Sequence, residues 1–143
     1  MITTREDGYE LSTDPNRVDV DLVHRWLSTD AYWALDRSRE TFEESVRGSL
    51  NFAVHDSAGQ QAAYARVVTD RATFAWLCDV YVAPAHRGRG LGTWLAGAVR
   101  DHLAPYRIQR ILLSTRDAHA IYAKAGFRPF PNPENLMILS PAQ

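Results

Sequence analysis

The sequence predicts an α/β fold whose elements follow one another in the order β-α-α-β-β-β-α-β-α-β-β. Three observations support this prediction. Apolar runs typical of strands alternate with segments whose apolar residues recur at helical spacing. The longest strand-like run, residues 73–82, leads through a glycine-rich turn directly into a helical pattern. No internal repeat or low-complexity linker divides the 143 residues, so we expect a single domain spanning residues 1–143.

The first part of the chain is expected to contain one short strand and one helix. Residues 8–12 can form the first strand. Asp19 is a residue type that accepts hydrogen bonds from the free N–H groups at a helix start, which predicts a helix after it. The apolar face of this helix is expected to consist of Leu22, Val23, Trp26 and Leu27.

A second helix and a strand hairpin are expected next. Residues 41–44, Thr-Phe-Glu-Glu, have the spacing of a capping box, which predicts a helix that begins there and ends near Gly48. Residues 51–55 and 61–69 have the composition of strands and flank an Asp-Ser-Ala-Gly turn at residues 56–59. These two strands are therefore expected to pair with each other.

The C-terminal part is expected to hold three strands and a helix. Residues 111–114 predict a short buried strand. Asp117 can cap a following helix, and Gly126 can end it. Residues 127–130 and 136–139 are expected to be the last two strands of the sheet, separated by a surface loop rich in proline.

The most informative segment is the glycine-rich turn after the long strand. It reads Arg-Gly-Arg-Gly-Leu-Gly over residues 87–92. Glycine permits a positive φ and a close approach of a ligand to the backbone, and free N–H groups at a helix start bind anions. Arg87 and Arg89 add two guanidinium groups that can bind the same anion. The turn predicts a phosphate site; a tight connection that binds no ligand is the alternative.

The spacing of the glycines distinguishes between kinds of phosphate site. A dinucleotide fold requires Gly-x-Gly-x-x-Gly and an acidic residue about 20 positions later, and a nucleotide P-loop requires a lysine after its last glycine. Neither pattern is present, so a nucleotide-binding module is a lower-ranked alternative. The spacing of Arg87, Gly90 and Gly92 resembles the Arg-x-x-Gly-x-Gly motif of the GCN5-related N-acetyltransferases, the GNAT superfamily. In that family the turn holds the pyrophosphate of acetyl-coenzyme A (acetyl-CoA).

The resemblance covers the whole chain and implies both a fold and a donor site. The fold is that of the acyl-CoA N-acyltransferases, in which a central mixed sheet flanked by helices splays apart where acetyl-CoA inserts. Thr115 stands where the family often has asparagine, and its hydroxyl can replace only part of the amide's hydrogen bonding. The implied pantetheine contacts are Val80, Tyr81 and Val82, and the implied phosphate contacts are Arg87, Gly88, Arg89, Gly90, Leu91, Gly92 and Thr93.

The resemblance also implies catalytic residues. Tyr122, in the segment Ile-Tyr-Ala-Lys-Ala-Gly-Phe, matches the family's tyrosine that protonates the leaving thiolate; its alternative is a purely structural aromatic. A phenol, with a pKa of about 10, is a suitable proton donor to a thiolate. Asp79 is the expected base or ammonium-binding group, although a carboxylate bonded to the backbone is an equal alternative. The implied reaction is direct acetyl transfer, with the oxyanion bound by a backbone N–H, that of Val82.

The acceptor site is expected at the loop of residues 30–39, which in this family walls the acceptor pocket. Tyr32 and Trp33 are adjacent aromatics in a polar loop, a pattern typical of binding surfaces; closing the core is the alternative. Arg37 can pair with a substrate carboxylate. His119 is a second candidate for the substrate side and for the base, because its unperturbed pKa lies near neutrality.

Composition limits the classes of partner. A net charge of −1 argues against a general nucleic-acid or anionic-membrane surface. The N-terminus is polar, and no apolar run approaches the about 20 residues needed to span a bilayer. A single cysteine, Cys78, excludes an intrachain disulfide and a multi-cysteine metal site. We therefore expect a cytoplasmic protein with no metal, nucleic-acid or membrane partner, and leave a homodimer open.

The function expected from these features is transfer of acetyl from acetyl-CoA to the primary amine of a small molecule. A protein or peptide N-acetyltransferase is the alternative among enzymes. A non-catalytic acyl-CoA sensor is the alternative from another class, and the presence of Tyr122 counts against it. The sequence leaves the acceptor and the acyl-chain preference open.

Overall fold

The computed structural model describes residues 1–140 and contains a six-stranded sheet with the order β1-β2-β3-β4-β5-β6. Neighbouring strands from β1 to β5 run antiparallel, whereas β6 runs parallel to β5. The sheet is therefore mixed, as expected. The strands are β1 (Ile2–Thr4), β2 (Glu10–Ser12), β3 (Leu50–His55), β4 (Gln61–Thr69), β5 (Phe74–Val82) and β6 (Arg110–Leu112).

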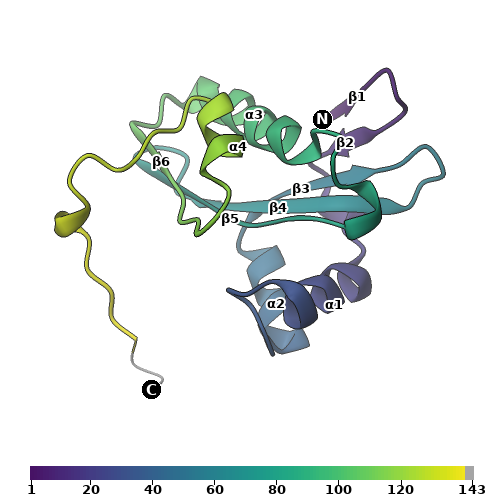
Figure 1. Ribbon diagram of the computed structural model, residues 1–143, viewed down its shortest axis with the longest axis horizontal. Helices are drawn as coiled ribbons and strands as arrows, with labels where there is room; N and C mark the ends of the chain where they lie inside the picture. The colour runs from purple at the N-terminus through teal and green to yellow at the C-terminus, as the bar shows by residue number, and fades with distance from the viewer. Residues whose placement is uncertain (141–143) are drawn as a thin grey trace.

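Helices cover both faces of this sheet (Figure 1). Helices α1 (Val20–Asp30) and α2 (Arg39–Arg47) pack on one face, and α3 (Leu91–Leu103) and α4 (His119–Lys124) lie on the other. A separate apolar core fills each side, one built around α3 and one around α1 and α2. None of the helices in residues 1–140 has the length and apolar character needed to cross a membrane.

The first two helices begin where a side chain satisfies their free N–H groups. Asp19 caps α1 as predicted, because its carboxylate accepts a hydrogen bond from the Leu22 N–H at 3.2 Å. Helix α2 begins before the predicted residues 41–44, because Ser38 Oγ accepts a hydrogen bond from the Thr41 N–H at 3.1 Å. It ends at Gly48, as predicted.

The predicted cap of the last helix is wrong. The N-cap residue of α4 is Ala118, which makes no side-chain capping bond, and Asp117 precedes it. The turn before α4 is closed instead by Thr115, whose hydroxyl accepts a hydrogen bond from the Ala118 N–H at 3.1 Å. A hydroxyl three residues before the N–H can close this turn, so the carboxylate of Asp117 is not needed for it.

The predicted strands differ from the structure mainly at the two ends of the chain. The strand over residues 61–69 is confirmed as β4. Strand β1 was not predicted, because its three residues are all exposed and show no alternation. The expected strand at residues 111–114 is displaced to Arg110–Leu112.

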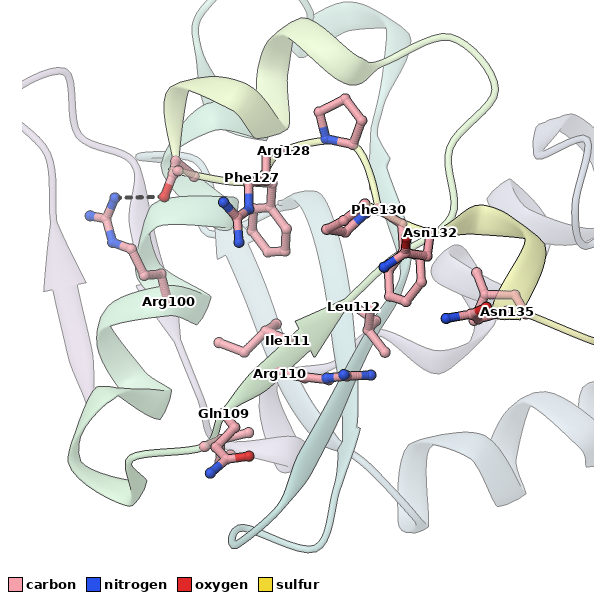
Figure 2. Close-up of a pocket in the computed structure, with 16 residues that line it drawn as sticks. Arg100, Gln109, Arg110, Ile111, Leu112, Phe127, Arg128, Phe130, Asn132 and Asn135 are labelled. Atoms are coloured by element: carbon pink, nitrogen blue, oxygen red, sulfur yellow. Dashed lines mark hydrogen bonds between the residues drawn. The ribbon is translucent and has the colours of Figure 1, made fainter.

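The two last predicted strands, residues 127–130 and 136–139, are not formed. Of residues 127–140, only Pro133–Asn135 form a regular element, a short 3₁₀ turn. The segment runs away from the sheet (Figure 1), so it has no neighbouring strand to which its backbone can hydrogen-bond. Its first part borders a cavity of about 680 Å³ beside β6 (Figure 2). The observed order is therefore β-β-α-α-β-β-β-α-β-α.

The sheet splays apart between β5 and β6. These strands pair only where Phe74, Ala75 and Trp76 face residues 110–112. Farther along, residues 77–82 have no strand partner on this side within the described chain. The splay places an open backbone edge beside the start of α3.

A β-bulge in β5 lies next to the splay. The register between β4 and β5 shifts between Tyr64 and Arg66, and Asp79 has φ of 53°. The extra residue exchanges the two faces of the strand. Leu77 packs in the core with α3, but beyond the bulge Val80 takes that side. Asp79 is thereby directed toward the side of α1 and α2.

Candidate active site

A cavity of about 650 Å³ lies at the splay. Its walls come from β5, from the loop between α1 and α2, from the loop after β6 and from α4. It brings together predicted site residues that are far apart in sequence: Tyr32, Trp33, Arg37, Asp79, Val80, Tyr81, Val82, Arg87, Thr115 and Tyr122. His119 is exposed at the start of α4 and is not part of the cavity wall.

Arg87, the first residue of the glycine-rich turn, lines one end of this cavity, whereas the other predicted phosphate contacts, residues 88–93, continue from it into α3 and are not part of the cavity wall. Gly88 and Gly90 have φ of 80° and 75°, the left-handed region that glycine adopts without strain. A Cβ at Gly88 would meet no heavy atom within 4 Å, so the space in front of the turn is open. The positive φ, rather than crowding, is therefore what requires glycine here.

The start of α3 carries free donors. Gly90 is its N-cap residue and makes no side-chain capping bond. Trp94 N–H donates to the Gly90 carbonyl at 3.0 Å, so the preceding residues 91–93 have no intrahelical acceptor for their N–H groups. Free N–H groups at the positive end of a helix form an anion site. The predicted phosphate contacts thus have the required local geometry.

Arg87 turns from the glycine turn back toward the cavity. Its Nε donates to the Val82 carbonyl at 3.0 Å, and its Nη2 lies 3.4 Å from the Asp30 carboxylate. The guanidinium also lies 5.5 Å from the centre of the Tyr81 ring. Arg87 therefore connects the phosphate turn with the strand beside it.

Arg5 is a residue at the turn that sequence reasoning missed. Its Nη2 donates to the Arg89 carbonyl at 2.9 Å, and its guanidinium lies 5.1 Å from the centre of the Trp94 ring. It also pairs with Asp7 at 2.5 Å. Only the fold brings the N-terminal hairpin beside residues 89–94, so nothing local in the sequence marks Arg5.

The open edge of β5 presents backbone groups to the cavity. The Val82 carbonyl accepts from Arg87 on this side, whereas the next N–H, that of Ala83, donates to Ala62 on the opposite side. The N–H and C=O of one strand residue point to the same side, and neighbouring residues alternate. The N–H of Val82 therefore points into the splay, as its predicted role requires.

Tyr122 lies half-buried on α4 and lines the cavity. Burial raises the pKa of its hydroxyl to about 12, so the phenol is protonated at neutral pH. Its ring packs edge-on against Phe127, with centroids 6.0 Å apart. The proton-donor role and the structural role predicted for Tyr122 are thus compatible, because its ring packs against Phe127 while the residue lines the cavity.

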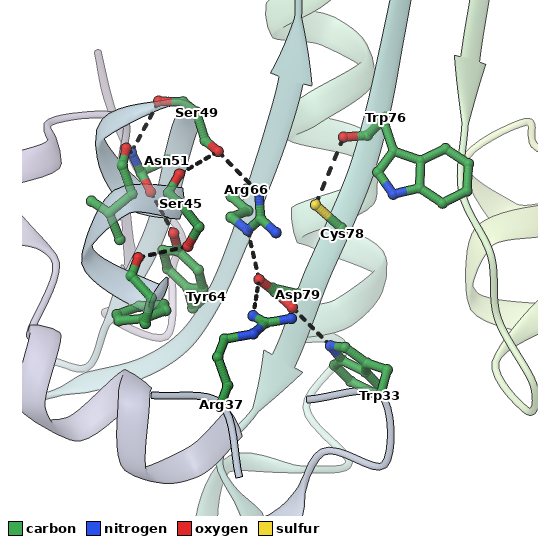
Figure 3. A network of polar contacts seen from close by, with 12 residues as sticks. Trp33, Arg37, Ser45, Ser49, Asn51, Tyr64, Arg66, Trp76, Cys78 and Asp79 are labelled. Carbon is green, nitrogen blue, oxygen red and sulfur yellow. Dashed lines mark hydrogen bonds and ion pairs between the residues drawn. The ribbon is translucent and has the colours of Figure 1, made fainter. Parts of the chain in front are cut away.

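Asp79 sits at the centre of a charged network (Figure 3). Its Oδ2 accepts from Arg66 Nε at 2.6 Å and from Arg37 Nη1 at 2.7 Å, and its Oδ1 accepts from Trp33 Nε1 at 2.8 Å. Its side chain is only 1% exposed. Burial by itself would raise the pKa of this carboxyl, but the two guanidinium groups, Arg66 first, outweigh burial and hold it below its ordinary value.

This network bears on the roles predicted for Asp79 and Arg37. A carboxylate whose pKa is lowered is a poor base, and both of its oxygens already accept hydrogen bonds. The geometry favours a positioning role for Asp79, in which it orients Trp33 and Arg37. Two guanidinium groups around one carboxylate also leave the cluster with a net positive charge.

Arg66, the second arginine of this network, was not predicted as a site residue. It projects from β4, and its Nη1 donates to Ser49 Oγ at 3.2 Å. Burial would lower the pKa of this guanidinium, but Asp79 raises it above its ordinary value. A sequence signal did exist, since Arg66 interrupts the otherwise apolar run of residues 62–68. Because a buried charge needs a partner, an arginine within such an apolar run indicates a nearby carboxylate.

The aromatic pair of the loop between α1 and α2 lines the cavity rather than closing the core. Tyr32 and Trp33 are 38% and 42% exposed, and their rings meet edge-on with centroids 5.0 Å apart. Tyr32 also contacts the loop after β6, because its hydroxyl accepts from the Arg116 N–H at 3.0 Å. The Arg116 guanidinium lies 3.7 Å from the centre of the Tyr32 ring. These contacts bridge the cavity between its two loops.

Tyr81 and Cys78 are two further polar residues of the cavity, and both are protonated at neutral pH. The Tyr81 hydroxyl donates to the Asp30 carboxylate at 2.5 Å, and burial first, then Asp30, raises the pKa of this phenol to about 12. Burial also raises the pKa of the Cys78 thiol to about 11, so it is a neutral thiol at physiological pH. A thiol with a raised pKa is a weak nucleophile, so Cys78 is not an activated cysteine.

A splayed mixed sheet, a glycine turn with free N–H groups and a buried phenol together define an acyl-CoA acyltransferase type of site. Residues 20–127 match the family model described as "Acetyltransferase (GNAT) family". The chain therefore belongs to the GNAT family and is an acetyltransferase.

Known proteins with similar sequence or structure support this assignment. A structure from Xanthomonas campestris pv. campestris, assigned to the GNAT family, is 40% identical with a TM-score of 0.87, covering 96% of this chain and 95% of that one. A Gibberella zeae protein named as an acetyltransferase is 29% identical over 85% of this chain and 78% of its own length. Vibrio cholerae spermidine N-acetyltransferase, in complex with CoA and spermine, shares the fold at 19% identity and a TM-score of 0.66, covering 82% and 79% of the two chains.

Proposed function

We propose that this acetyltransferase moves the acetyl group of acetyl-CoA directly to the primary amine of a small molecule. One observation carries the proposal. The open edge of β5, Tyr122 and Arg87 line one cavity, and the free N–H groups at the start of α3 follow Arg87 closely along the chain. A pyrophosphate needs these N–H groups and Arg87, an extended amide-bearing arm needs the open edge, and a thioester needs the phenol.

The residues present fit the donor. The start of α3 with Arg87 and Arg89 provides backbone donors and positive charge for the pyrophosphate. The unpaired edge of residues 77–82 provides hydrogen-bonding groups for the amides of the pantetheine arm. The CoA in the Vibrio cholerae relative supports the choice of this donor.

The chemistry then needs an oxyanion donor and a proton donor. The neutral amine nitrogen attacks the thioester carbonyl and releases its extra proton to solvent, the Val82 N–H stabilises the oxyanion, and the carbon–sulfur bond breaks as the carbonyl reforms. Tyr122 gives its proton to the leaving thiolate and regains one from solvent. Its pKa of about 12 keeps the phenol protonated at neutral pH, which this role requires.

The acceptor that best fits the cavity is a small amine with an anionic group. Arg37 and Arg66 outnumber the carboxylate of Asp79 on the acceptor side. A polyamine such as the spermine bound by the Vibrio cholerae enzyme would meet this positive cluster with like charge. The bridge between Tyr32 and Arg116 narrows the cavity, which favours a small molecule over a peptide.

The test is a measurement of CoA release with acetyl-CoA and a panel of amino acids, amino sugars, polyamines and peptides. We expect turnover with carboxylate-bearing amines, and Arg37→Ala should raise their KM by about 10-fold or more, the effect of a lost charged hydrogen bond. The matched control is Arg39→Ala, because Arg39 lies outside the cavity and pairs with Glu43 on the surface. Turnover with polyamines alone, or equal KM values for both variants, would contradict the anionic acceptor.

A further inference from the structure

Asp30 is a carboxylate of the cavity that takes no part in the network around Asp79. It is the last residue of α1 and lies in the wall formed by the loop between α1 and α2. The Tyr81 hydroxyl donates to its Oδ2 at 2.5 Å, and the Tyr81 ring stacks on Trp26 with centroids 5.4 Å apart. A helix end and a packed phenol therefore hold this carboxylate in place.

Asp30 suits an ammonium group better than the other carboxylates of the cavity do. Asp79 already accepts hydrogen bonds at both oxygens. Asp117 lies in the opposite wall, after β6, close enough to Tyr122 to help raise the pKa of that phenol. Both contacts of Asp30 use Oδ2, which leaves its Oδ1 open within residues 1–140. A carboxylate oxygen that is fixed but open can accept a hydrogen bond from an ammonium group.

Arg87 occupies positions that both substrates need. Its Nη2 lies 3.4 Å from the Asp30 carboxylate, where it takes the place of an ammonium group. Its Nε donates to the Val82 carbonyl at 3.0 Å, and this carbonyl belongs to the open edge on which the pantetheine arm of the donor is expected to lie. An amide of that arm and Arg87 therefore compete for one carbonyl.

The glycine turn offers Arg87 another partner. Arg87 directly precedes Gly88, and the phosphates of the donor are expected at residues 88–93. The side chains of Arg87 and Asp30 are 54% and 55% exposed, and an ion pair of this kind contributes little. A pyrophosphate carries more charge and can accept two hydrogen bonds from one guanidinium, so it can draw Arg87 away from Asp30.

We propose that Asp30 binds the ammonium group of the acceptor, and that Arg87 covers Asp30 until the phosphates of the donor draw Arg87 away. This role for Asp30 rests on the proposed function, because it needs a bound donor and an amine acceptor. Arg37 and Arg66 line the same cavity, so an acceptor with an ammonium and an anionic group finds a partner for each. The donor then binds first, since its arrival opens Asp30 to the acceptor.

Asp30 binds the amine but does not take its proton. The Tyr81 hydroxyl first, and then Arg87, lower the pKa of the Asp30 carboxyl, so this carboxylate is a weak base. The proton that the ammonium group loses before attack therefore passes to solvent, as in the reaction proposed above. The bond from the Tyr81 hydroxyl remains when Arg87 leaves, which keeps the carboxylate in position.

The first experiment measures CoA affinity by calorimetry in a double-mutant cycle of Asp30→Asn and Arg87→Ala. In the wild-type background Asp30→Asn should tighten CoA binding by about 3-fold, because Arg87 no longer has to leave an ion pair. In the Arg87→Ala background the same change should have no effect. Asp117→Asn removes a carboxylate from the opposite wall and measures the effect of charge alone. Equal effects of Asp30→Asn in the two backgrounds would show that Arg87 does not cover Asp30.

The second experiment detects binding of glycine, β-alanine and 4-aminobutyrate by ligand-observed NMR, with and without CoA. At least one of these amines should bind the CoA complex, with affinity about 10-fold or more lower in Asp30→Asn, and Asp30→Glu should recover part of it. Without CoA, the same amine should bind Arg87→Ala more tightly than wild type. Asp36→Asn removes a carboxylate of the same loop outside the cavity and should behave as wild type. Binding by none of the amines, or equal affinity in Asp30→Asn and Asp36→Asn, would overturn the ammonium site.

Kinetics with acetyl-CoA separate the ammonium site from the proposed function. An unchanged KM for the amine in Asp30→Asn would leave the acetyltransferase reaction standing and would contradict the role of Asp30. No turnover with any amine would contradict the proposed function, while the calorimetric cycle still reports whether Asp30 and Arg87 are coupled. Circular dichroism of each variant establishes that it is folded.

Discussion

Asp79 shows how a single residue connects the fold with the site. Its φ of 53° lies in a region that L-residues rarely adopt, although Asp and Asn tolerate it better than most. The bulge that contains it exchanges the faces of β5 and brings the carboxylate between Arg37 and Arg66. A strained backbone and a buried ion-pair network at the same residue indicate that the surrounding structure holds this position firmly.

We expect Asp79→Asn to destabilise the protein in a pH-dependent way. Asparagine retains the shape and tolerates the positive φ, but it leaves two partly buried guanidinium groups without their carboxylate, which costs about 3–5 kcal/mol in comparable buried pairs. Because the folded-state pKa of Asp79 is lowered, its contribution is present above the unfolded pKa of about 3.9 and is lost as pH falls through the folded pKa.

Urea unfolding at several pH values measures this difference. The gap in unfolding free energy between wild type and Asp79→Asn should be largest near neutrality and should shrink below about pH 4. Asp21→Asn is a suitable control, because the Asp21 side chain is 69% exposed in its pair with Arg39. A gap that does not change with pH would show that the charge of Asp79 is not what stabilises the network.

Tyr122 provides the residue-scale prediction about catalysis. Tyr122→Phe keeps the ring that packs on Phe127 but removes the proton donor, so kcat should fall by roughly 10²-fold with donor affinity nearly unchanged. Steady-state kinetics and calorimetry with CoA measure the two quantities. Unchanged kcat would mean that water protonates the thiolate or that chemistry does not limit turnover.

At the scale of an element, the backbone conformation of the turn before α3 decides whether the N–H groups at the start of this helix are accessible to a ligand. Gly90 has φ of 75° at the N-cap position, and its lack of a side chain leaves the first N–H groups of the helix open to a ligand. Gly90→Val should therefore weaken CoA binding by about 10-fold or more, a loss of at least about 1.4 kcal/mol. Calorimetric titration with CoA measures this change.

The control for this prediction is Gly59→Val in the turn between β3 and β4. Gly59 has φ of 84°, and a Cβ at this position would meet no heavy atom within 4 Å, so valine there brings similar backbone strain far from the donor site. Both variants should lose comparable stability, but only Gly90→Val should lose affinity for CoA. Equal CoA affinity in the two variants would place the phosphate site elsewhere.

Elements with a local cause were predictable from the sequence. Asp19 and Gly48 mark helix ends through their own chemistry, and the turn over residues 56–59 lies between two runs of strand composition. The start of α2 was misplaced because Ser38 and residues 41–44 offer competing caps of similar type. Strand β1 was not predicted, because a run of three residues does not by itself indicate a strand and only its pairing with β2 makes it one.

At the scale of the whole molecule, the cavity exists because β5 and β6 diverge. Their three paired positions fix the parallel start of the splay, and the bulge at Asp79 turns β5 beyond it. The two loops that bear Tyr32 and Arg116 then close over the gap from opposite sides. No single element contains the site.

The sequence by itself determined the family, the order of most elements and the glycine turn, because spacing and residue type carry this information locally; the resemblance to the family then pointed to Tyr122 and to residues 30–39. Only the tertiary structure decided that Asp79 is held by Arg37 and Arg66, that Arg5 reaches the glycine turn and that residues 127–140 leave the sheet. The physical reason is the same in each case. A pKa, an ion pair or a paired strand depends on which groups the fold brings within a few ångströms, and those groups are distant in the chain.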